Sequence, residues 1–455
     1  MQKITHPKAG ILLHISSLPS GNMGRDAYRF VDFLHDVGVK VWQTLPLNMP
    51  HADGSPYQCL SAHAGNPAFI CKQQLADENL LSLNDANRQK FKSFCRKHAS
   101  WLNDFAMFLV LRAQFYSVSW NTWPKLYKLR DSETLGQLKK QHADEIEAIK
   151  FTQFQFFSQW VALKKYANKK GVAMFGDIPI FVAFDSADVW ANPQLFKLDK
   201  RCNMKVVAGV PPDYFSQTGQ HWGNPHYNWR AMKADGYQWW LERMVTQNWL
   251  FDMVRIDHFR GLQAAWEIPA KEDTAINGKW RRAPGSALLA AIKQHFPHMC
   301  LVAEDLGIIT PQVNALRAKF KLPGMKILQF AFGGGDDNYY LPANIEPNSV
   351  AYTGTHDNDT TLGWYNTLES HAKAHLHEVL ENNVPNIPFD LVKMVLNTKA
   401  DLAIIPMQDI LELDSKSRMN TPGTLGGNWN WRFSWSQLRP EFKAQFALAI
   451  NESGR

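Results

Sequence analysis

Cysteine is scarce in this chain, which has five cysteines among 455 residues and no C-x-x-C pair. They are far apart in the sequence, at Cys59, Cys71, Cys95, Cys202 and Cys300. An odd, widely spaced set does not indicate a disulfide framework, and a zinc site of the common kinds needs closely spaced pairs. The histidines also show no metal-ligand spacing. We therefore expect no bound metal.

Long apolar runs are absent as well. No stretch approaches the roughly 20 apolar residues that a membrane-spanning helix needs. The apolar run nearest the N-terminus, ILLHI from Ile11, is shorter than the core of a secretory signal. We therefore expect no membrane partner and a location in the cytoplasm.

Clusters of like charge are missing too, although the formal net charge is +7, from 49 Lys and Arg against 42 Asp and Glu. A positive charge can indicate a polyanionic partner. Nucleic-acid-binding proteins, however, gather their basic residues on one face or in one stripe. Here the basic residues occur as scattered pairs such as Lys139-Lys140 and Lys164-Lys165. We expect no nucleic-acid partner.

Aromatic residues, by contrast, are plentiful, with 17 Trp, 12 Tyr and 27 Phe. Aromatic faces stack on sugar rings and on bases, although most of these aromatic residues must fill a large core.

The chain is also long for one compact core. Its length indicates a single large domain with insertions, or two or three domains.

Eight apolar, β-branched runs predict buried parallel strands. Helical patterns separate them: apolar residues recur at helical spacing over residues 27–37, and Thr310 followed by Pro311 is typical of a helix start. Alternating strands and helices predict an α/β fold, a (β/α)8 TIM barrel. The eight runs are ILLHI from Ile11, VKVWQTL from Val39, VAMFGDIPIFV from Val172, FDMVRI from Phe251, CLVAE from Cys300, MKILQF from Met325, SVAYTGT from Ser349 and LAIIPM from Leu402.

Two stretches are too long for simple links between a strand and a helix. Residues 46–170 contain helical, aromatic-rich segments and predict an inserted, mainly helical subdomain within the 1–455 barrel domain. Residues 185–249 read as a loop first and as helix afterwards. Long loops in compact domains are usually functional, so we expect the second insertion to carry an active-site lid.

Three of the predicted strands end on acidic residues. Asp257 follows the fourth, Glu304 and Asp305 follow the fifth, and Asp357 and Asp359 follow the seventh. One such residue after a strand is usually an ordinary turn residue. Barrel enzymes, however, gather their catalytic groups at the carboxyl ends of the strands. Three acidic strand ends therefore favour a catalytic site.

The carboxylates suit cleavage of a glycosidic bond with retention, which needs one carboxylate as nucleophile and one carboxylic acid as proton donor. Asp257 suits the nucleophile and Glu304, with its longer side chain, the acid. Asp357 would stabilise the oxocarbenium charge. Arg255 lies two residues before Asp257 on the same strand face and could keep it ionised. These residues do not distinguish transfer from hydrolysis.

Seven motifs resemble those of the 4-alpha-glucanotransferases, also called amylomaltases or disproportionating enzymes, of glycoside hydrolase family 77 in the alpha-amylase clan. They occur in family order from about Gly10 to near Arg432, nearly the whole chain. The motifs are GILLHISSLPSG, SPYQCLSAHAGNP, GDIPIFVAFDSADVW, VAGVPPDYFSQTGQHWGNP, VRIDHFRG, VAEDLG and YTGTHDNDTTLGW.

The resemblance implies a role for each residue that matches a family motif. It gives Asp257 as nucleophile, Glu304 as acid/base and Asp357 as transition-state stabiliser, with Asp359 as the alternative for the last role. Further residues match positions that hold sugar units in the family: Tyr57, Asp213, Trp222, Arg255, His258, His356 and Asn428. His226 departs from the family pattern, which affects only local acceptor contacts.

Three other acidic residues are expected to be structural. Asp305 should make loop hydrogen bonds, because one carboxylate of an adjacent pair must point elsewhere. Asp177 and Asp185 should organise the loop after the third strand.

The resemblance implies a 4-alpha-glucanotransferase that acts without a cofactor on α-1,4-glucans and maltooligosaccharides. A transferase must exclude water from its glycosyl-enzyme intermediate. The segment 209–225, with Tyr214, Phe215 and Trp222 among Gly and Pro, has the composition of a mobile lid that would do so. The alternatives are an α-glucan hydrolase of the same clan and a non-catalytic glucan-binding protein. The oligomeric state is not indicated.

Overall fold

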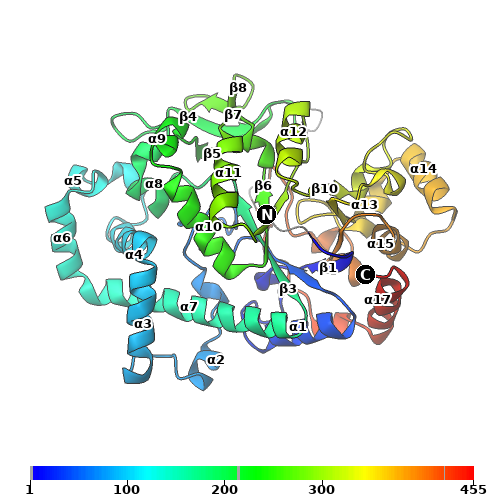
Figure 1. The fold of residues 1–455 in the computed structure, drawn as a ribbon, viewed down its shortest axis with the longest axis horizontal. Helices are drawn as coiled ribbons and strands as arrows, with labels where there is room; N and C mark the ends of the chain where they lie inside the picture. Colours follow the sequence, from blue (N-terminus) through cyan, green and yellow to red (C-terminus); the bar gives the residue numbers. More distant parts are fainter. Residues whose placement is uncertain (1–3, 213–215, 425) are drawn as a thin grey trace.

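Eight parallel strands form the centre of the computed structural model, which describes residues 4–212, 216–424 and 426–455. Their order is β10-β11-β12-β1-β2-β3-β6-β9, so paired strands follow one another along the barrel, β12 pairs with β1, and β9 and β10 are the two ends of the sheet. A hydrogen bond of 2.9 Å from Ala303 N to Pro323 O links the end of β9 to the start of β10. The sheet is therefore a nearly closed barrel (Figure 1), and the predicted (β/α)8 class is confirmed.

All eight predicted runs overlap a barrel strand, although β1 begins at Lys8, three residues before the run from Ile11. The runs are mainly apolar because a barrel strand is buried on both faces. The strands are β1 (Lys8–Leu12), β2 (Val41–Gln43), β3 (Ala173–Pro179), β6 (Met253–Asp257), β9 (Cys300–Ala303), β10 (Gly324–Ile327), β11 (Ser349–Tyr352) and β12 (Leu402–Pro406).

Helices surround the barrel. The predicted helix after the first strand is α1, and Gly38 just beyond it has φ +85°, the left-handed conformation expected there. The segment between β10 and β11, all of it described, forms two 3-10 turns and no α-helix. No described helix is long and apolar enough to cross a membrane. The outer helices are α1 (Arg25–Asp36), α7 (Ala143–Lys169), α10 (Gln238–Leu250), α11 (Gly285–His295), α12 (Pro311–Lys319), α13 (Thr361–Thr367), α14 (Ser370–Leu380), α15 (Phe389–Leu396) and α17 (Pro440–Glu452).

The range 46–170 contains two kinds of helix. Helix α7 packs against α1 and β3 and is the barrel's own helix between β2 and β3. The helices before it extend to one side of the barrel (Figure 1). They are α2 (Lys72–Asp77), α3 (Asp85–Lys97), α4 (Ala99–Gln114), α5 (Lys125–Lys128) and α6 (Ser132–Gln141).

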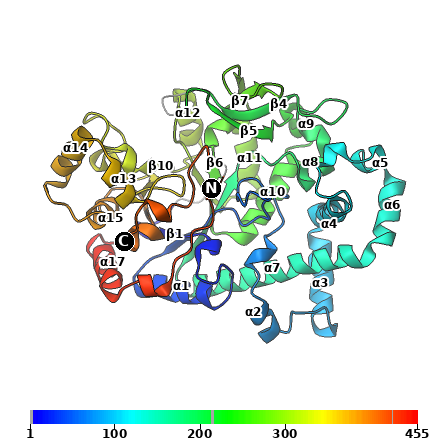
Figure 2. The ribbon, with the colours of Figure 1, turned by 180° about the vertical axis from the view of Figure 1, so that it is seen from behind.

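The range 185–249 differs from its expected loop-then-helix form. After α8 (Ala187–Ala191) it forms a hairpin of β4 (Val206–Val210) and β5 (Gln220–Pro225), and only then α9 (Trp229–Ala234) and α10. The hairpin joins β7 (Ala264–Pro269) and β8 (Lys279–Arg282) in a four-stranded sheet of order β5-β4-β7-β8. Figure 2 shows this sheet beside β6 and α12. The expectation of a loop was wrong because the β5 sequence, QHWGNP, is rich in turn residues and lies in a strand only through its pairing with β4.

The inside of the barrel is filled with side chains, so the barrel has no pore. A site for a large substrate must therefore lie at an end of the barrel. The interior cluster contains Leu12, Val41, Phe175, Met253, Val302, Met325, Ile327, Val350, Tyr352, Leu402 and Ile404.

Candidate active site

Asp257 is the last residue of β6 and is bound by an arginine inside the barrel. Arg255 Nη2 lies 2.8 Å from Asp257 Oδ1, and Arg255 Nη1 lies 2.6 Å from Asp177 Oδ2. Burial raises the pKa of Asp257, and the Arg255 guanidinium opposes that rise. Arg255 thus favours the ionised form that a nucleophile needs, as expected from its place on the strand.

Glu304 follows β9, the neighbour of β6, and is held by two backbone N–H groups. His258 N donates to Oε2 at 2.6 Å and Leu306 N donates to Oε1 at 2.8 Å. His258 has φ 50°, an uncommon backbone conformation outside glycine. Burial raises the pKa of Glu304, while Arg255 and the two N–H donors lower it. A carboxyl group with a raised pKa suits a proton donor.

The adjacent Asp305 points away from this pair. Its Oδ1 accepts a hydrogen bond of 2.7 Å from Met325 N, and its Oδ2 lies 3.1 Å from Arg317 Nε. A side chain at Gly324 would collide with this carboxylate, since its Cβ would come within 2.3 Å of Oδ2. The expected structural role of Asp305 is confirmed.

Asp357 lies in the loop after β11, and its side chain is 44% exposed. Asn420 Nδ2 donates to its Oδ1 at 2.6 Å. Burial is the main cause of the raised pKa of Asp257, and the negative charges of Asp177, Glu304 and Asp357 add to it, as is expected of carboxylates that lie near one another. The carboxylate of Asp359, in contrast, is engaged by Ser415 Oγ at 2.8 Å and by Thr360 N at 2.8 Å. Between the two, the geometry favours Asp357.

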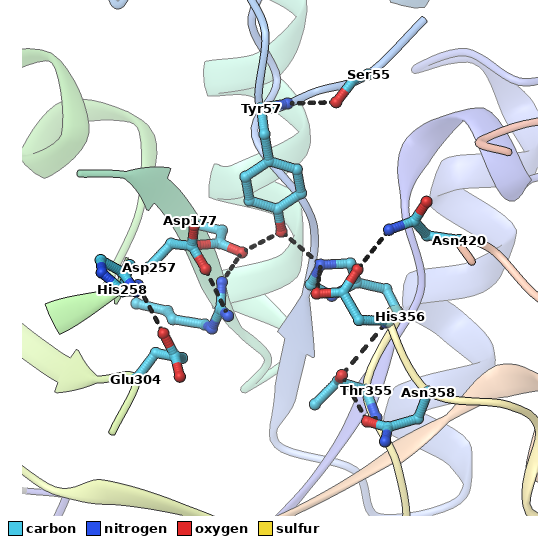
Figure 3. Close-up of polar contacts among 12 residues, drawn as sticks. Ser55, Tyr57, Asp177, Asp257, His258, Glu304, Thr355, His356, Asn358 and Asn420 are labelled. Carbon is cyan, nitrogen blue, oxygen red and sulfur yellow. Dashed lines mark hydrogen bonds and ion pairs between the residues drawn. The ribbon is translucent and has the colours of Figure 1, made fainter. Parts of the chain in front are cut away.

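Tyr57 connects the two sides of the site. Its hydroxyl donates to Asp177 Oδ2 at 2.7 Å and lies 2.8 Å from His356 Nε2 (Figure 3). A phenol has one proton to donate, so His356 Nε2 must donate to the Tyr57 oxygen. Burial lowers the pKa of His356, which keeps the imidazole neutral. The two rings also stack, with centroids 5.3 Å apart and planes at 11°.

Asp177 was expected to organise the loop after the third strand, and that expectation was wrong. It lies within β3 opposite Arg255, is 1% exposed, and is bonded to Arg255 and Tyr57. An acidic residue inside a buried apolar run was the available signal, since a buried charge needs a partner. Asp185 does organise its surroundings, accepting from Trp120 N at 3.1 Å and pairing with Arg112.

Trp222 lies in β5 and contacts His258, the residue after Asp257. Its ring packs edge-on against His258, with centroids 4.8 Å apart and planes at 89°. Gln58, next to Tyr57, is hydrogen bonded to Asn224 in the same strand, with Nε2 donating to Asn224 Oδ1 at 3.0 Å. Strand β5 is thus attached to the segment that carries Tyr57.

Two further predicted binding residues are Asp213 and Asn428. Asp213 lies outside the described residues, as do Tyr214 and Phe215. Asn428 uses its side chain within its own loop, accepting from Thr421 N at 3.0 Å.

The structure also places the indole of Trp429 and the imidazole of His226. Trp429, which the sequence did not single out, packs against Tyr57 and His356 at centroid distances of 5.9 and 6.1 Å. Only its aromatic neighbours in the WNWR segment could have indicated it. His226 directly follows β5 and is buried, and its Nε2 lies 3.1 Å from the backbone oxygen of Trp266 in β7.

A barrel with Asp and Glu at the carboxyl ends of neighbouring strands, and an arginine on the Asp, fits the class of enzymes that cleave or transfer glycosidic bonds with retention. The family model described as 4-alpha-glucanotransferase matches residues 13–88 and 74–438. The chain belongs to this family of enzymes.

Individual relatives agree over nearly the whole length. A 4-alpha-glucanotransferase of Thermus thermophilus is 43% identical, covering 99% of each chain. One of Streptococcus pneumoniae serotype 4 is 41% identical, covering 95% of this chain and 94% of the relative. Among solved structures, the amylomaltase of Streptococcus agalactiae in complex with acarbose is 35% identical, with a TM-score of 0.95 and 99% of each chain covered. These similarities favour transfer over the alternative of hydrolysis.

Proposed function

We propose that Asp257, Glu304 and Asp357 carry a double displacement that moves an α-1,4-glucan segment to the 4-hydroxyl of glucose or of a maltooligosaccharide. The observation that supports this most strongly is the pair at the ends of β6 and β9. Arg255 holds Asp257 at 2.8 Å, and two backbone N–H groups orient Glu304 beside it. The substrate class is supported by the family and by acarbose, the ligand of the related amylomaltase.

In the first step Asp257 attacks the anomeric carbon and forms a glycosyl ester. The bond from this carbon to the leaving oxygen breaks, and Glu304 gives its proton to that oxygen. The exposed carboxylate of Asp357 faces the positive charge that develops on the sugar. His258 Nε2 is buried and has no hydrogen-bond partner among the described residues, so it is available to a sugar hydroxyl.

In the second step Glu304, now ionised, removes the proton from the acceptor hydroxyl. The acceptor oxygen attacks the anomeric carbon, and the ester bond to Asp257 breaks. Formation of the ester removes one negative charge near Glu304, which lowers its pKa and suits it to act as a base. Attack from the opposite side in each step returns the α configuration.

The products from maltotriose test the function. We expect glucose together with maltotetraose and longer oligosaccharides, because transfer conserves the number of glycosidic bonds. Thin-layer chromatography of a time course would show this ladder. Glucose and maltose without any longer product would contradict transfer and identify a hydrolase.

Trp222→Ala should shift the products of maltotriose toward hydrolysis. The ring packs against His258 beside Glu304, so its loss admits water to the glycosyl-enzyme. We expect the ratio of transfer to hydrolysis to fall several-fold, with total cleavage less affected. Glucose release and chain-length distribution, measured on one sample, give the ratio.

Trp280→Ala is the matched control. Trp280 belongs to the same four-stranded sheet but packs on Arg260, at 3.6 Å from the guanidinium carbon to the ring centroid. Its replacement should leave the ratio unchanged. An unchanged ratio in Trp222→Ala would show that this ring does not control which hydroxyl attacks.

A further inference from the structure

The loop that carries His356 and Asp357 is tied at both ends to one buried carboxylate, Asp409. Thr353 Oγ1 donates to Asp409 Oδ2 at 2.5 Å. Thr361 donates twice, from Oγ1 to Oδ2 at 2.6 Å and from its backbone N to Oδ1 at 2.8 Å. Asp409 is 3% exposed, so it cannot touch a sugar.

These contacts join three neighbouring parts of the fold. Thr353 directly follows β11, and Thr361 is the first residue of α13. Asp409 lies in the short helix α16 (Met407–Ile410), which directly follows β12, the strand beside β11. The residues between the two threonines form the catalytic loop. Since both ends of this loop meet the same carboxylate, its position relative to the barrel depends on that carboxylate.

A second loop, which contains residues 417–420, holds Asp357 from the other side and is also attached to α16. Asn420 Nδ2 donates to Asp357 Oδ1 at 2.6 Å, and Arg418 Nη2 donates to the backbone oxygen of Asp357 at 3.1 Å. Gln408, the neighbour of Asp409, donates from Nε2 to Ser417 O at 3.2 Å in this second loop. Helix α16 therefore supports both loops that meet at Asp357.

We propose that Asp409 is a positioning residue that sets the place of the Asp357 carboxylate in the site. The inference rests on the proposed role of Asp357 as the stabiliser of the transition state. Three hydrogen bonds to one carboxylate favour its ionised form, although burial raises its pKa. Hydrogen bonds to an ionised group are roughly twice as strong as neutral ones. Loss of the charge would therefore loosen both ends of the loop together.

The test is a double-mutant cycle between Asp409→Asn and Asp357→Asn. Asparagine keeps the shape of the side chain but removes its charge and replaces one acceptor oxygen with a donor. The measured quantity is kcat with α-maltosyl fluoride, normalised to active sites titrated with a 5-fluoro-glycosyl trapping reagent. We expect Asp409→Asn to lower kcat roughly 10-fold in the parent and to have almost no effect in the Asp357→Asn background.

The outcomes separate this inference from the proposed site. Equal losses from Asp409→Asn in both backgrounds, or no loss in the parent, would overturn the positioning role. Full activity in Asp357→Asn alone would instead contradict the role of Asp357 itself. If Asp409→Asn does not fold, Thr361→Val removes one of the three hydrogen bonds and enters the same cycle with the same expected coupling.

Asp252→Asn is the matched control for removing a hydrogen-bonded carboxylate. Asp252 precedes β6 at the opposite end of the barrel strands, where its Oδ2 accepts from Met174 N and from Asn168 Nδ2, each at 2.8 Å. Its replacement should change the midpoint of thermal unfolding but not kcat per titrated site. A loss of kcat in this control equal to that of Asp409→Asn would also overturn the inference.

Discussion

Replacing Asp257 with asparagine is expected to abolish glucan transfer and to leave the fold intact. Without the carboxylate no glycosyl ester forms, and loss of a nucleophile of this kind lowers kcat by about 10⁴-fold or more. Arg255 keeps its ion pair of 2.6 Å with Asp177, so no buried charge is left alone. Transfer from maltotriose and covalent labelling by a 5-fluoro-glycosyl reagent should both disappear.

The fold of this variant should be at least as stable as the parent's. Burial raises the pKa of Asp257, so the folded state binds a proton more readily than the unfolded chain. Above the unfolded-state pKa, the ionised carboxylate therefore destabilises the folded state, and asparagine removes this cost. An unchanged or higher midpoint of thermal unfolding is the expected result. Covalent labelling of Asp257→Asn at the parent's rate would contradict the assignment of Asp257 as the nucleophile.

A small nucleophile offers a second test of Asp257. In Asp257→Gly, azide can enter the space that the carboxylate vacates and attack α-maltosyl fluoride from that side. The product would be the β-glycosyl azide, identified by its anomeric coupling constant in proton NMR. Formation of the α-glycosyl azide would place the missing group on the other face of the sugar.

The barrel could be predicted from the sequence because each buried strand has an apolar run of its own, which can be recognised without knowing its partners. A parallel strand buried on both faces is mainly apolar, and the run at β12, LAIIP, shows it directly. Strands β3 and β6 are apolar apart from Asp177 in β3 and from Arg255 and the terminal Asp257 in β6. The positions of Asp257 and Glu304, the proposed catalytic carboxylates, could be predicted for the same reason, because both residues stand where apolar runs stop.

Strands and side-chain contacts that depend on a partner far away in the sequence could not be predicted in this way. Strand β8, KWRR, is exposed along its whole length and has no apolar pattern to reveal it. The contacts of Asp177 with Tyr57 and of Asp409 with Thr353 join residues 120 and 56 positions apart. A single sequence does not identify such partners, because an Asp taken alone is also common in turns.

Replacing Glu304 with glutamine is expected to separate the two steps of the reaction. Glutamine can accept the hydrogen bonds from His258 N and Leu306 N at only one oxygen, and it cannot give a proton to the leaving oxygen. Activity on maltotriose should fall by about 10²- to 10⁴-fold. Fluoride needs little help to leave, so glycosylation from α-maltosyl fluoride should be nearly retained. Burst kinetics of fluoride release would measure it.

Asp305→Asn serves as the control, because Asp305 is the adjacent carboxylate and bonds Met325 N and Arg317 instead of facing the sugar. It should lose stability, with equal effects on both donors. Equal losses on maltotriose and on maltosyl fluoride in Glu304→Gln would remove the acid role.

Azide should distinguish Glu304 from Asp257 by stereochemistry. In the Glu304 variant the ester to Asp257 still forms, and azide, which needs no base, can attack it from the face that Glu304 occupies. The product should therefore be the α-glycosyl azide, opposite to that of Asp257→Gly. If both variants gave the same anomer, the two carboxylates could not lie on opposite sides of the reacting carbon, and the double displacement would be wrong.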